Sequence, residues 1–130
     1  MNIGIHFFDL LIWFFGLPEK CEVYLSNPNR MGGTLELERA RVRWFLSVDG
    51  ADLPEGYLAS GKSAFRSITI DGQEIEFSDG FTDLHTRVYE RILSERGFGI
   101  RDARPSIELV HAIRTCTVVP PPRDAHPLLA

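Results

Sequence analysis

The residues best suited to do chemistry stand together near the start of the chain, at Asn2, His6 and Asp9. On a helix, His6 and Asp9 are three residues apart and neighbour one another, and Asn2 lies one turn before His6. A carboxylate beside an imidazole fixes its tautomer and raises its basicity, which suits a general base. The same spacing fits a buried histidine that bonds Asp9 only to satisfy its polar atoms, and on spacing alone this structural role is the commoner one.

Weaker candidates lie elsewhere in the chain. His85 and His111 are read as surface residues of helices, and His126 lies in a tail with no recognisable partner. Arg41 and Arg43 alternate along a strand, where they could bind a carboxylate or a pyrophosphate. A face turned toward solvent or another subunit is the more common explanation for the two arginines.

Length and composition describe one ordinary globular domain. The 130 residues are 44% hydrophobic and 25% charged, which is typical of such domains. A net charge of -4 and a pI near 5.5 argue against a nucleic-acid partner. Cys21 and Cys116 match no metal spacing, and without a secretory signal they predict reduced thiols in the cytoplasm and no metal site.

A strongly apolar segment, residues 7–17, must position His6 and Asp9. It is too short to span a bilayer, so no membrane role is expected. The pattern predicts a helix that Gly16 and Pro18 terminate. A helix that is apolar nearly all round is typical of the interior of a larger protein.

The middle of the chain alternates apolar and polar residues and predicts strands. Residues 21–25 form a short strand followed by a turn at 26–29, and residues 34–49 form a longer one. The apolar phase switches near Arg39, which requires a bulge or a turn there.

Residues 67–77 predict a hairpin around Asp71-Gly72, because this dipeptide is a strong signal for a two-residue turn. The register places Ile70 opposite Gln73 and Ile68 opposite Ile75, with Arg66 opposite Phe77 beyond them.

Two helices follow the hairpin. The first spans residues 81–96 and is closed by Gly97, and the second spans about 103–114 with Asp102 as its N-cap. Their expected buried stripes are Phe81, Leu84, Val88 and Ile92 in the first, and Ala103, Ile107, Val110 and Ile113 in the second. A proline-rich tail, extended and docked at most, completes the chain.

These elements predict an α+β fold, because strands and helices are segregated along the chain. We expect one mainly antiparallel open sheet that includes the hairpin, with helices on one face. Residues 1–130 would then be a single domain.

Several segments resemble the glucose–fructose oxidoreductase, inositol dehydrogenase and rhizopine-catabolism (Gfo/Idh/MocA) family. Residues 4–16 fit its G-x-H-x-x-D-x-x-x-W-x-x-G segment. Residues 37–47, 81–85, 97–100 and 102–110 are similar to the branch that oxidises UDP-N-acetylglucosaminuronate at C3 in lipopolysaccharide O-antigen synthesis. The blocks cover most of the chain.

The resemblance implies roles for the three candidate residues. His6 corresponds to the histidine that contacts the reacting sugar hydroxyl, and Asp9 to an acidic position that orients rather than reacts. Asn2 stands where many members have aspartate, which weakens a proton relay through this position, although an amide can still bond a hydroxyl. Asn2 and Asp9 are therefore expected to bind substrate and His6 to act on it.

The resemblance also implies that NAD belongs to the intact enzyme and not to this chain. Gly97-Phe98-Gly99 lacks the third glycine and the preceding strand of a dinucleotide site, and neither Lys20 nor Lys62 stands in the family's Glu-Lys-Pro turn. We therefore expect a truncated substrate-binding and oligomerisation domain without its N-terminal Rossmann domain, with Met1 inside a longer reading frame.

Three functions remain open at this point. The first is the substrate-binding half of a nucleotide-sugar dehydrogenase, inactive alone, and the second is a non-catalytic oligomerisation module. The third is a freestanding sugar-binding protein. The uncovered apolar helix predicts a homo-oligomer, a dimer or larger.

Overall fold

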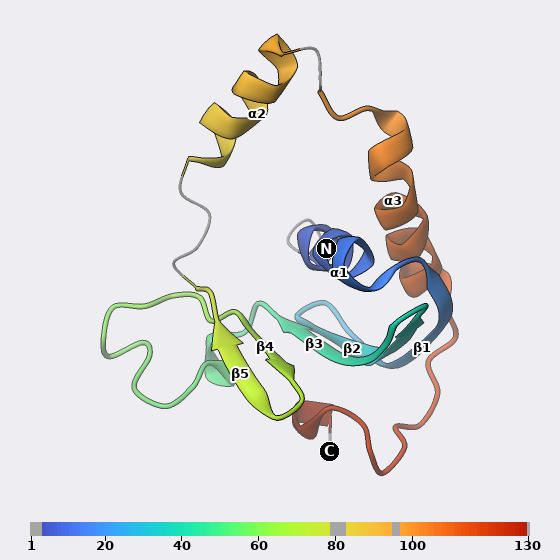
Figure 1. Cartoon of the computed structure of the whole chain (residues 1–130). Helices are drawn as coiled ribbons and strands as arrows, with labels where there is room; N and C mark the ends of the chain where they lie inside the picture. The colour runs from blue at the N-terminus through green and yellow to red at the C-terminus, as the bar shows by residue number, and fades with distance from the viewer. Residues whose placement is uncertain (1–3, 79–82, 95–96, 130) are drawn as a thin grey trace. The chain divides into compact units, whose positions relative to one another are not determined.

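The structure is a computed structural model that describes residues 4–78, 83–94 and 97–129 (Figure 1). It divides into two compact units. The first unit joins Met1–Val48 to Phe98–Ala130, and the second is Asp49–Gly97. His6 and Asp9 both belong to the first unit.

A three-stranded antiparallel sheet forms the centre of the first unit. Its strands are β1 (Pro18–Ser26), β2 (Arg30–Leu37) and β3 (Ala40–Ser47), in the order β1-β2-β3. The predicted switch near Arg39 is a tight turn, because β2 ends two residues before β3 begins. The short strand and the turn predicted at 21–29 are also present.

The two faces of this sheet have different partners. The register places Leu35 opposite Val42 and Gly33 opposite Trp44. Leu35 and Trp44 belong to the buried core that the helices complete. Because side chains alternate across a strand, Arg43 and Phe45 lie on the opposite face.

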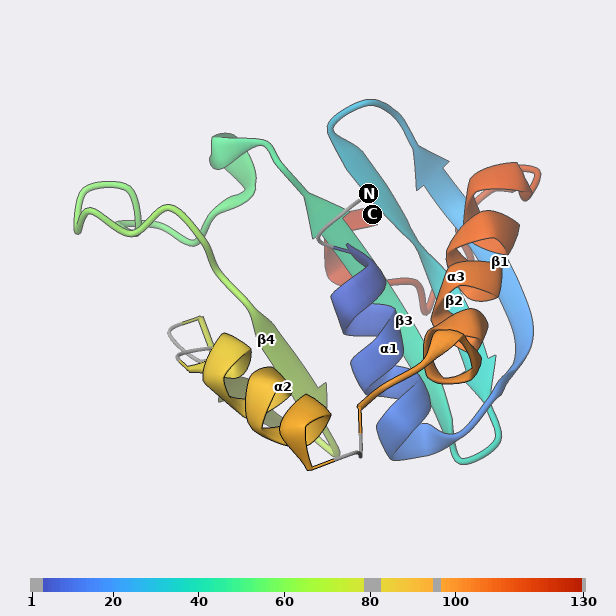
Figure 2. The same ribbon diagram turned by 90° about the horizontal axis from the view of Figure 1, so that it is seen from above.

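Helix α1 (Gly4–Phe15) packs one side on the sheet, and α3 lies beside it (Figure 2). Phe8 and Leu11 are buried, and the Phe8 ring meets Trp44 edge-on with the ring centroids 5.3 Å apart. Gly16 terminates the helix with a φ of 89°, and its N–H donates to Ile12 O at 2.9 Å. The predicted end of this helix is confirmed.

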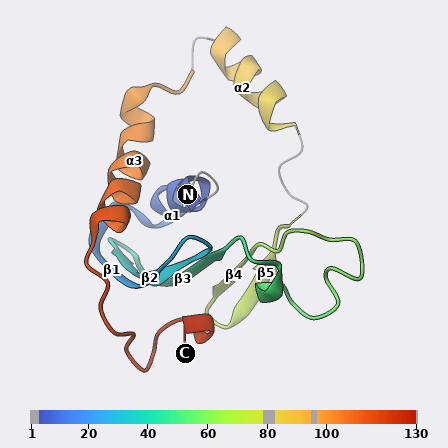
Figure 3. The ribbon, with the colours of Figure 1, turned by 180° about the vertical axis from the view of Figure 1, so that it is seen from behind.

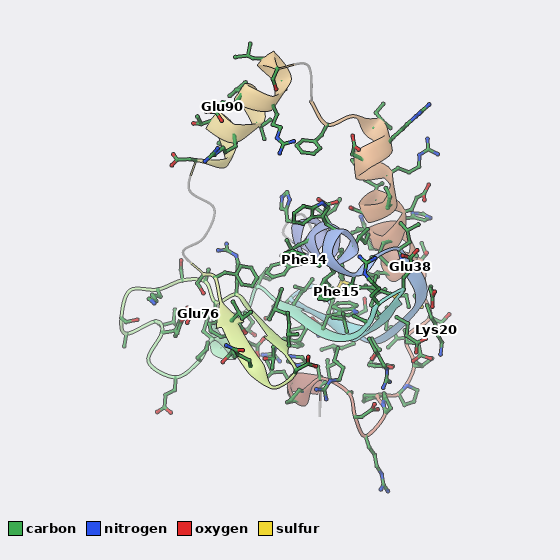
Figure 4. All side chains as sticks on the ribbon, in the orientation of Figure 1. Phe14, Phe15, Lys20, Glu38, Glu76 and Glu90 are labelled. Carbon is green, nitrogen blue, oxygen red and sulfur yellow. The ribbon has the colours of Figure 1, made fainter. Side chains whose placement is uncertain are left out.

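The turn between β2 and β3 holds the C-terminal end of α1. Arg39 donates from Nη2 to Phe14 O at 2.9 Å and from its backbone N–H to Phe15 O at 3.0 Å. These bonds satisfy carbonyls that a helix end leaves without partners. Phe15 packs against the core, whereas the neighbouring Phe14 is 48% exposed (Figure 4).

Helix α3 (Ile100–Thr115) begins three residues earlier than predicted. Its N-cap is Gly99, so the assignment of Asp102 as N-cap is wrong. Asp102 instead stands in the first turn, where its carboxylate accepts the Gly99 N–H at 2.7 Å. An acidic side chain can serve either position, because both place it near the unpaired N–H groups of the helix start.

The buried stripe of α3 also differs from the prediction. It consists of Ser106, Leu109 and Ile113, whereas Ala103 and Ile107 are exposed. Apolar residues occur on more than one side of this helix, and its contact with α1 selects which side is buried.

The C-terminal tail covers the sheet face away from the helices (Figures 1 and 3). Val118 forms a parallel bridge to Val23 in β1. A last 3-10 turn, Pro127–Leu129, brings Leu129 so close to Gly32 that a Cβ at Gly32 would lie 2.6 Å from Leu129 Cδ2. The tail is docked, and β2 has a glycine where the tail presses on the sheet.

The second unit contains the predicted hairpin. Strands β4 (Ser67–Ile70) and β5 (Gln73–Glu76) pair Ile70 with Gln73 and Ile68 with Ile75. Asp71 and Gly72 adopt φ angles of 50° and 83°, as a type I′ turn requires. The register is confirmed, but the hairpin forms a two-stranded sheet of its own, so its predicted place in a single sheet is wrong.

The second unit also contains helix α2 (Leu84–Leu93) and a short 3-10 turn at Gly50–Asp52. Ser94 caps α2, so its predicted closure by Gly97 is wrong. Val88 and Ile92 of the predicted buried stripe are 43% and 53% exposed, and Phe81 lies outside the described residues.

The fold class is α+β with antiparallel strands, as predicted. In the first unit, α1 and α3 lie on one face of the sheet (Figure 1). In the described part of the chain, no helix has both the length and the apolar character needed to cross a membrane.

Candidate active site

His6 lies on the side of α1 that is turned away from the core. Its side chain is exposed, whereas Phe8 on the same helix is 1% exposed. The helix therefore packs on the core through Phe8 and leaves the imidazole of His6 exposed.

The alternative structural role of His6 is wrong. A buried histidine paired with Asp9 would need both burial and a bond, and within residues 4–78, 83–94 and 97–129 no hydrogen bond joins the two side chains. Asn2 lies outside the described residues, so its predicted role stays a prediction.

Asp9 is bonded across the helix interface instead. Ser106 of α3 donates its hydroxyl to Asp9 Oδ1, and Ser106 is only 3% exposed. A buried hydroxyl without a partner costs about 1–3 kcal/mol, and a bond to a charged carboxylate offsets this penalty. The pair therefore ties α1 to α3 beside His6.

Sequence reasoning missed Ser106. The signal that could have found it is a small polar residue in line with Leu109 and Ile113, at helical spacing on an apolar stripe. A serine there needs a partner from a neighbouring element, and nothing in the sequence says which element lies opposite.

The other predicted histidines lie apart from this pair. His85 is exposed on α2 in the second unit, and His111 is exposed on α3. His126 is half-buried and stacks on Phe45 with the ring centroids 5.7 Å apart. The expectation that His126 has no partner is therefore wrong, and burial lowers its pKa below the ordinary value, with Arg43 adding to the effect.

Arg41 and Arg43 hold the tail. Arg41 Nη1 pairs with Asp124 Oδ2 at 2.7 Å, and Arg43 Nη1 donates to Asp124 O at 3.3 Å. The hydrogen bond from Arg41, strengthened by its charge, lowers the pKa of Asp124. The two arginines therefore contact the chain's own C-terminal tail.

The two cysteines are free and half-buried. Cys116 Sγ lies 3.9 Å from Cys21 O. Burial, with a smaller contribution from Cys116, raises the pKa of the Cys21 thiol to about 11, so Cys21 is poorly suited to be a nucleophile. Among the described residues, no group of three or more His, Cys, Asp or Glu side chains could hold a metal ion.

The chemistry available on α1 is therefore that of one accessible imidazole beside one anchored carboxylate. An imidazole can take a proton from a hydroxyl near neutral pH. A carboxylate with one oxygen bonded by Ser106 keeps acceptor capacity on the other.

Known structures contain the same arrangement of helices and strands. No protein-family model matches the chain. Two crystal structures of the WlbA (WbpB) dehydrogenase from Thermus thermophilus match it, one with NAD and alpha-ketoglutarate and one with NAD and UDP-GlcNAcA. The TM-scores are 0.91 and 0.90, and the sequence identities are 50% and 47%. The chain resembles one part of a WlbA dehydrogenase in both sequence and fold.

The match covers 98% of this chain but only 41% of the WlbA chain. It confirms the resemblance to this group of dehydrogenases that residues 4–16 and the later blocks predicted. The greater part of WlbA has no counterpart in these 130 residues.

Proposed function

We propose that this chain is the C-terminal, substrate-binding domain of an NAD-dependent nucleotide-sugar dehydrogenase. Its substrate would be a UDP-N-acetylglucosaminuronate-like sugar, oxidised at the C3 hydroxyl. The single observation that carries the proposal is the 47% identity, over 98% of the chain, to a WlbA dehydrogenase crystallised with NAD and UDP-GlcNAcA.

In this proposal His6 accepts the proton of the C3 hydroxyl. Its exposed imidazole, on a helix that buries Phe8 and Leu11, supports that role, because a general base must reach the proton that it removes. Asp9 and Asn2 bind sugar hydroxyls, and Asp9 offers the carboxylate oxygen that Ser106 does not use.

NAD would be held by another part of the intact enzyme. In the described residues, the one glycine pair before a helix, Gly97 and Gly99, leads into α3, whose first turn carries the Asp102 carboxylate. A negative group at this helix start repels the pyrophosphate that such a site must bind. NAD supplies the oxidising chemistry when the rest of the enzyme holds it, and this chain alone is inactive.

A second role, self-association, is favoured by a specific observation. Trp13, Phe14 and Leu17, at the C-terminal end of α1, are 77%, 48% and 51% exposed. Large apolar side chains that lie close together on a surface usually mark a contact with another protein. We propose a cytoplasmic homo-oligomer, which is compatible with the dehydrogenase role and with a non-catalytic oligomerisation or sugar-binding module.

A chimera tests the dehydrogenase role. This chain replaces the matched segment of the Thermus thermophilus WlbA dehydrogenase, and NADH formation from UDP-GlcNAcA and NAD is followed by absorbance. We expect turnover from the chimera, and His6→Asn should lower it by about 10²- to 10⁴-fold, the usual share of general acid–base catalysis.

His85→Asn, which changes an exposed histidine of the second unit, is the matched control and should leave turnover unchanged. A folded chimera that binds NAD but never oxidises the sugar would contradict the proposed substrate. Near-normal turnover in the His6→Asn chimera would show that His6 is not the base.

A further inference from the structure

Ser106 is the feature of the first unit that packing alone does not explain. Among the buried residues that the structure describes, only Thr34 and Ser106 are polar. Ser106 lies between α1 and α3, in line with Leu109 and Ile113, where alanine would fill the same space without a polar atom. The hydroxyl is therefore needed for its bond to Asp9.

This bond decides where the Asp9 carboxylate lies. His6 and Asp9 are three residues apart on α1, so an unrestrained carboxylate could turn to the imidazole. Ser106 holds Oδ1 from the α3 side. The imidazole of His6 is thereby left without that partner.

We infer that Ser106 is a positioning residue, which keeps the Asp9 carboxylate on the α3 side and so leaves His6 and the second oxygen of Asp9 available to the sugar. The inference rests on the proposed function, in which His6 is the base and Asp9 accepts a hydrogen bond from the sugar. If the two side chains bonded each other, one ring nitrogen of His6 and one carboxylate oxygen of Asp9 would no longer be available to the substrate.

The other charged groups around α1 do not hold the Asp9 carboxylate in place. His6 and Asp9 are the titratable side chains of α1. One turn before Ser106 on α3, Asp102 is engaged by the Gly99 N–H. At the far end of α1, Arg39 bonds Phe14 O, and Glu38 lies against Gly16. The sheet side chains packed under α1 are apolar.

The tautomer of His6 shows whether the Asp9 carboxylate bonds the His6 imidazole. Long-range ¹H–¹⁵N spectra of the histidine-labelled chain at about pH 8, where an ordinary imidazole is neutral, distinguish the two tautomers. The His6→Asn spectrum identifies the His6 signals. In Ser106→Ala, we expect the released carboxylate to fix one tautomer, so that the ring nitrogen signals of His6 move apart from their positions in the unchanged chain.

Three further variants separate positioning from packing. Ser106→Thr keeps the hydroxyl and should retain the original spectrum. Ser106→Cys nearly keeps the volume but is a poor donor, so it should give the spectrum of Ser106→Ala even if the alanine variant does not fold. Ser106→Ala combined with Asp9→Asn removes the carboxylate and should return the His6 signals to their original positions.

The chimera adds a second, independent measurement. Ser106→Ala should lower kcat/KM for UDP-GlcNAcA by about tenfold to a hundredfold, as misplaced catalytic groups do, and Ser106→Thr should restore it. An unchanged His6 spectrum in folded Ser106→Ala or Ser106→Cys overturns the inference. A shifted spectrum together with an inactive parent chimera would overturn the proposed function but not the role of Ser106 in placing Asp9.

Discussion

Phe8 anchors the helix that carries His6 and Asp9, so its truncation to alanine tests how this site is held. The side chain is 1% exposed and meets Trp44 edge-on, with an interplanar angle of 89°. Removing a buried phenylalanine side chain costs about 3–5 kcal/mol, including the cavity that it leaves. A domain of this size has a free energy of unfolding of about 5–15 kcal/mol, so Phe8→Ala should lose a large share of it.

Ile107→Ala is the matched control, because Ile107 belongs to the same unit but is 54% exposed. Substitutions at exposed positions usually change stability by about 0.5 kcal/mol or less. Urea unfolding followed by circular dichroism measures both variants under the same conditions. A loss below about 1 kcal/mol for Phe8→Ala, or equal losses for both variants, would refute the packing of α1 on the sheet.

Three other predictions concern exposed and buried side chains. The chain should sediment as a dimer or larger at micromolar concentration. Trp13→Glu should shift it toward monomer, because Trp13 is 77% exposed on α1. A stable monomer of the unchanged chain would contradict the self-association role. Because burial raises the pKa of Cys21 to about 11, folded chain should resist alkylation at Cys21 near pH 8, and rapid modification there would contradict its burial. The raised pKa of Cys21 contributes stability that is fully present below the ordinary thiol pKa of 9.0 and is lost as the pH rises toward about 11. The urea midpoint of the unchanged chain should therefore fall over that interval, and it should fall less in Cys21→Ser.

Local patterns determined much of this fold. The Asp71-Gly72 turn and the period-2 alternation around it determined the hairpin register, because both depend on neighbouring residues only. Gly16 determined the end of α1, and the phase switch near Arg39 determined a turn, for the same reason. The motif at residues 4–16 indicated the dehydrogenase group, because its residue types and their spacing are properties of the linear sequence alone.

Tertiary structure decided which faces and which partners these elements have. The sequence of α3 fits more than one buried stripe, and only its contact with α1 buries Ser106 and exposes Ile107. The bond from Ser106 to Asp9 joins residues 97 positions apart, and the Arg41 to Asp124 pair joins residues 83 apart. Such pairs depend on how elements pack in three dimensions, whereas periodicity records only which residues share one side of a single element.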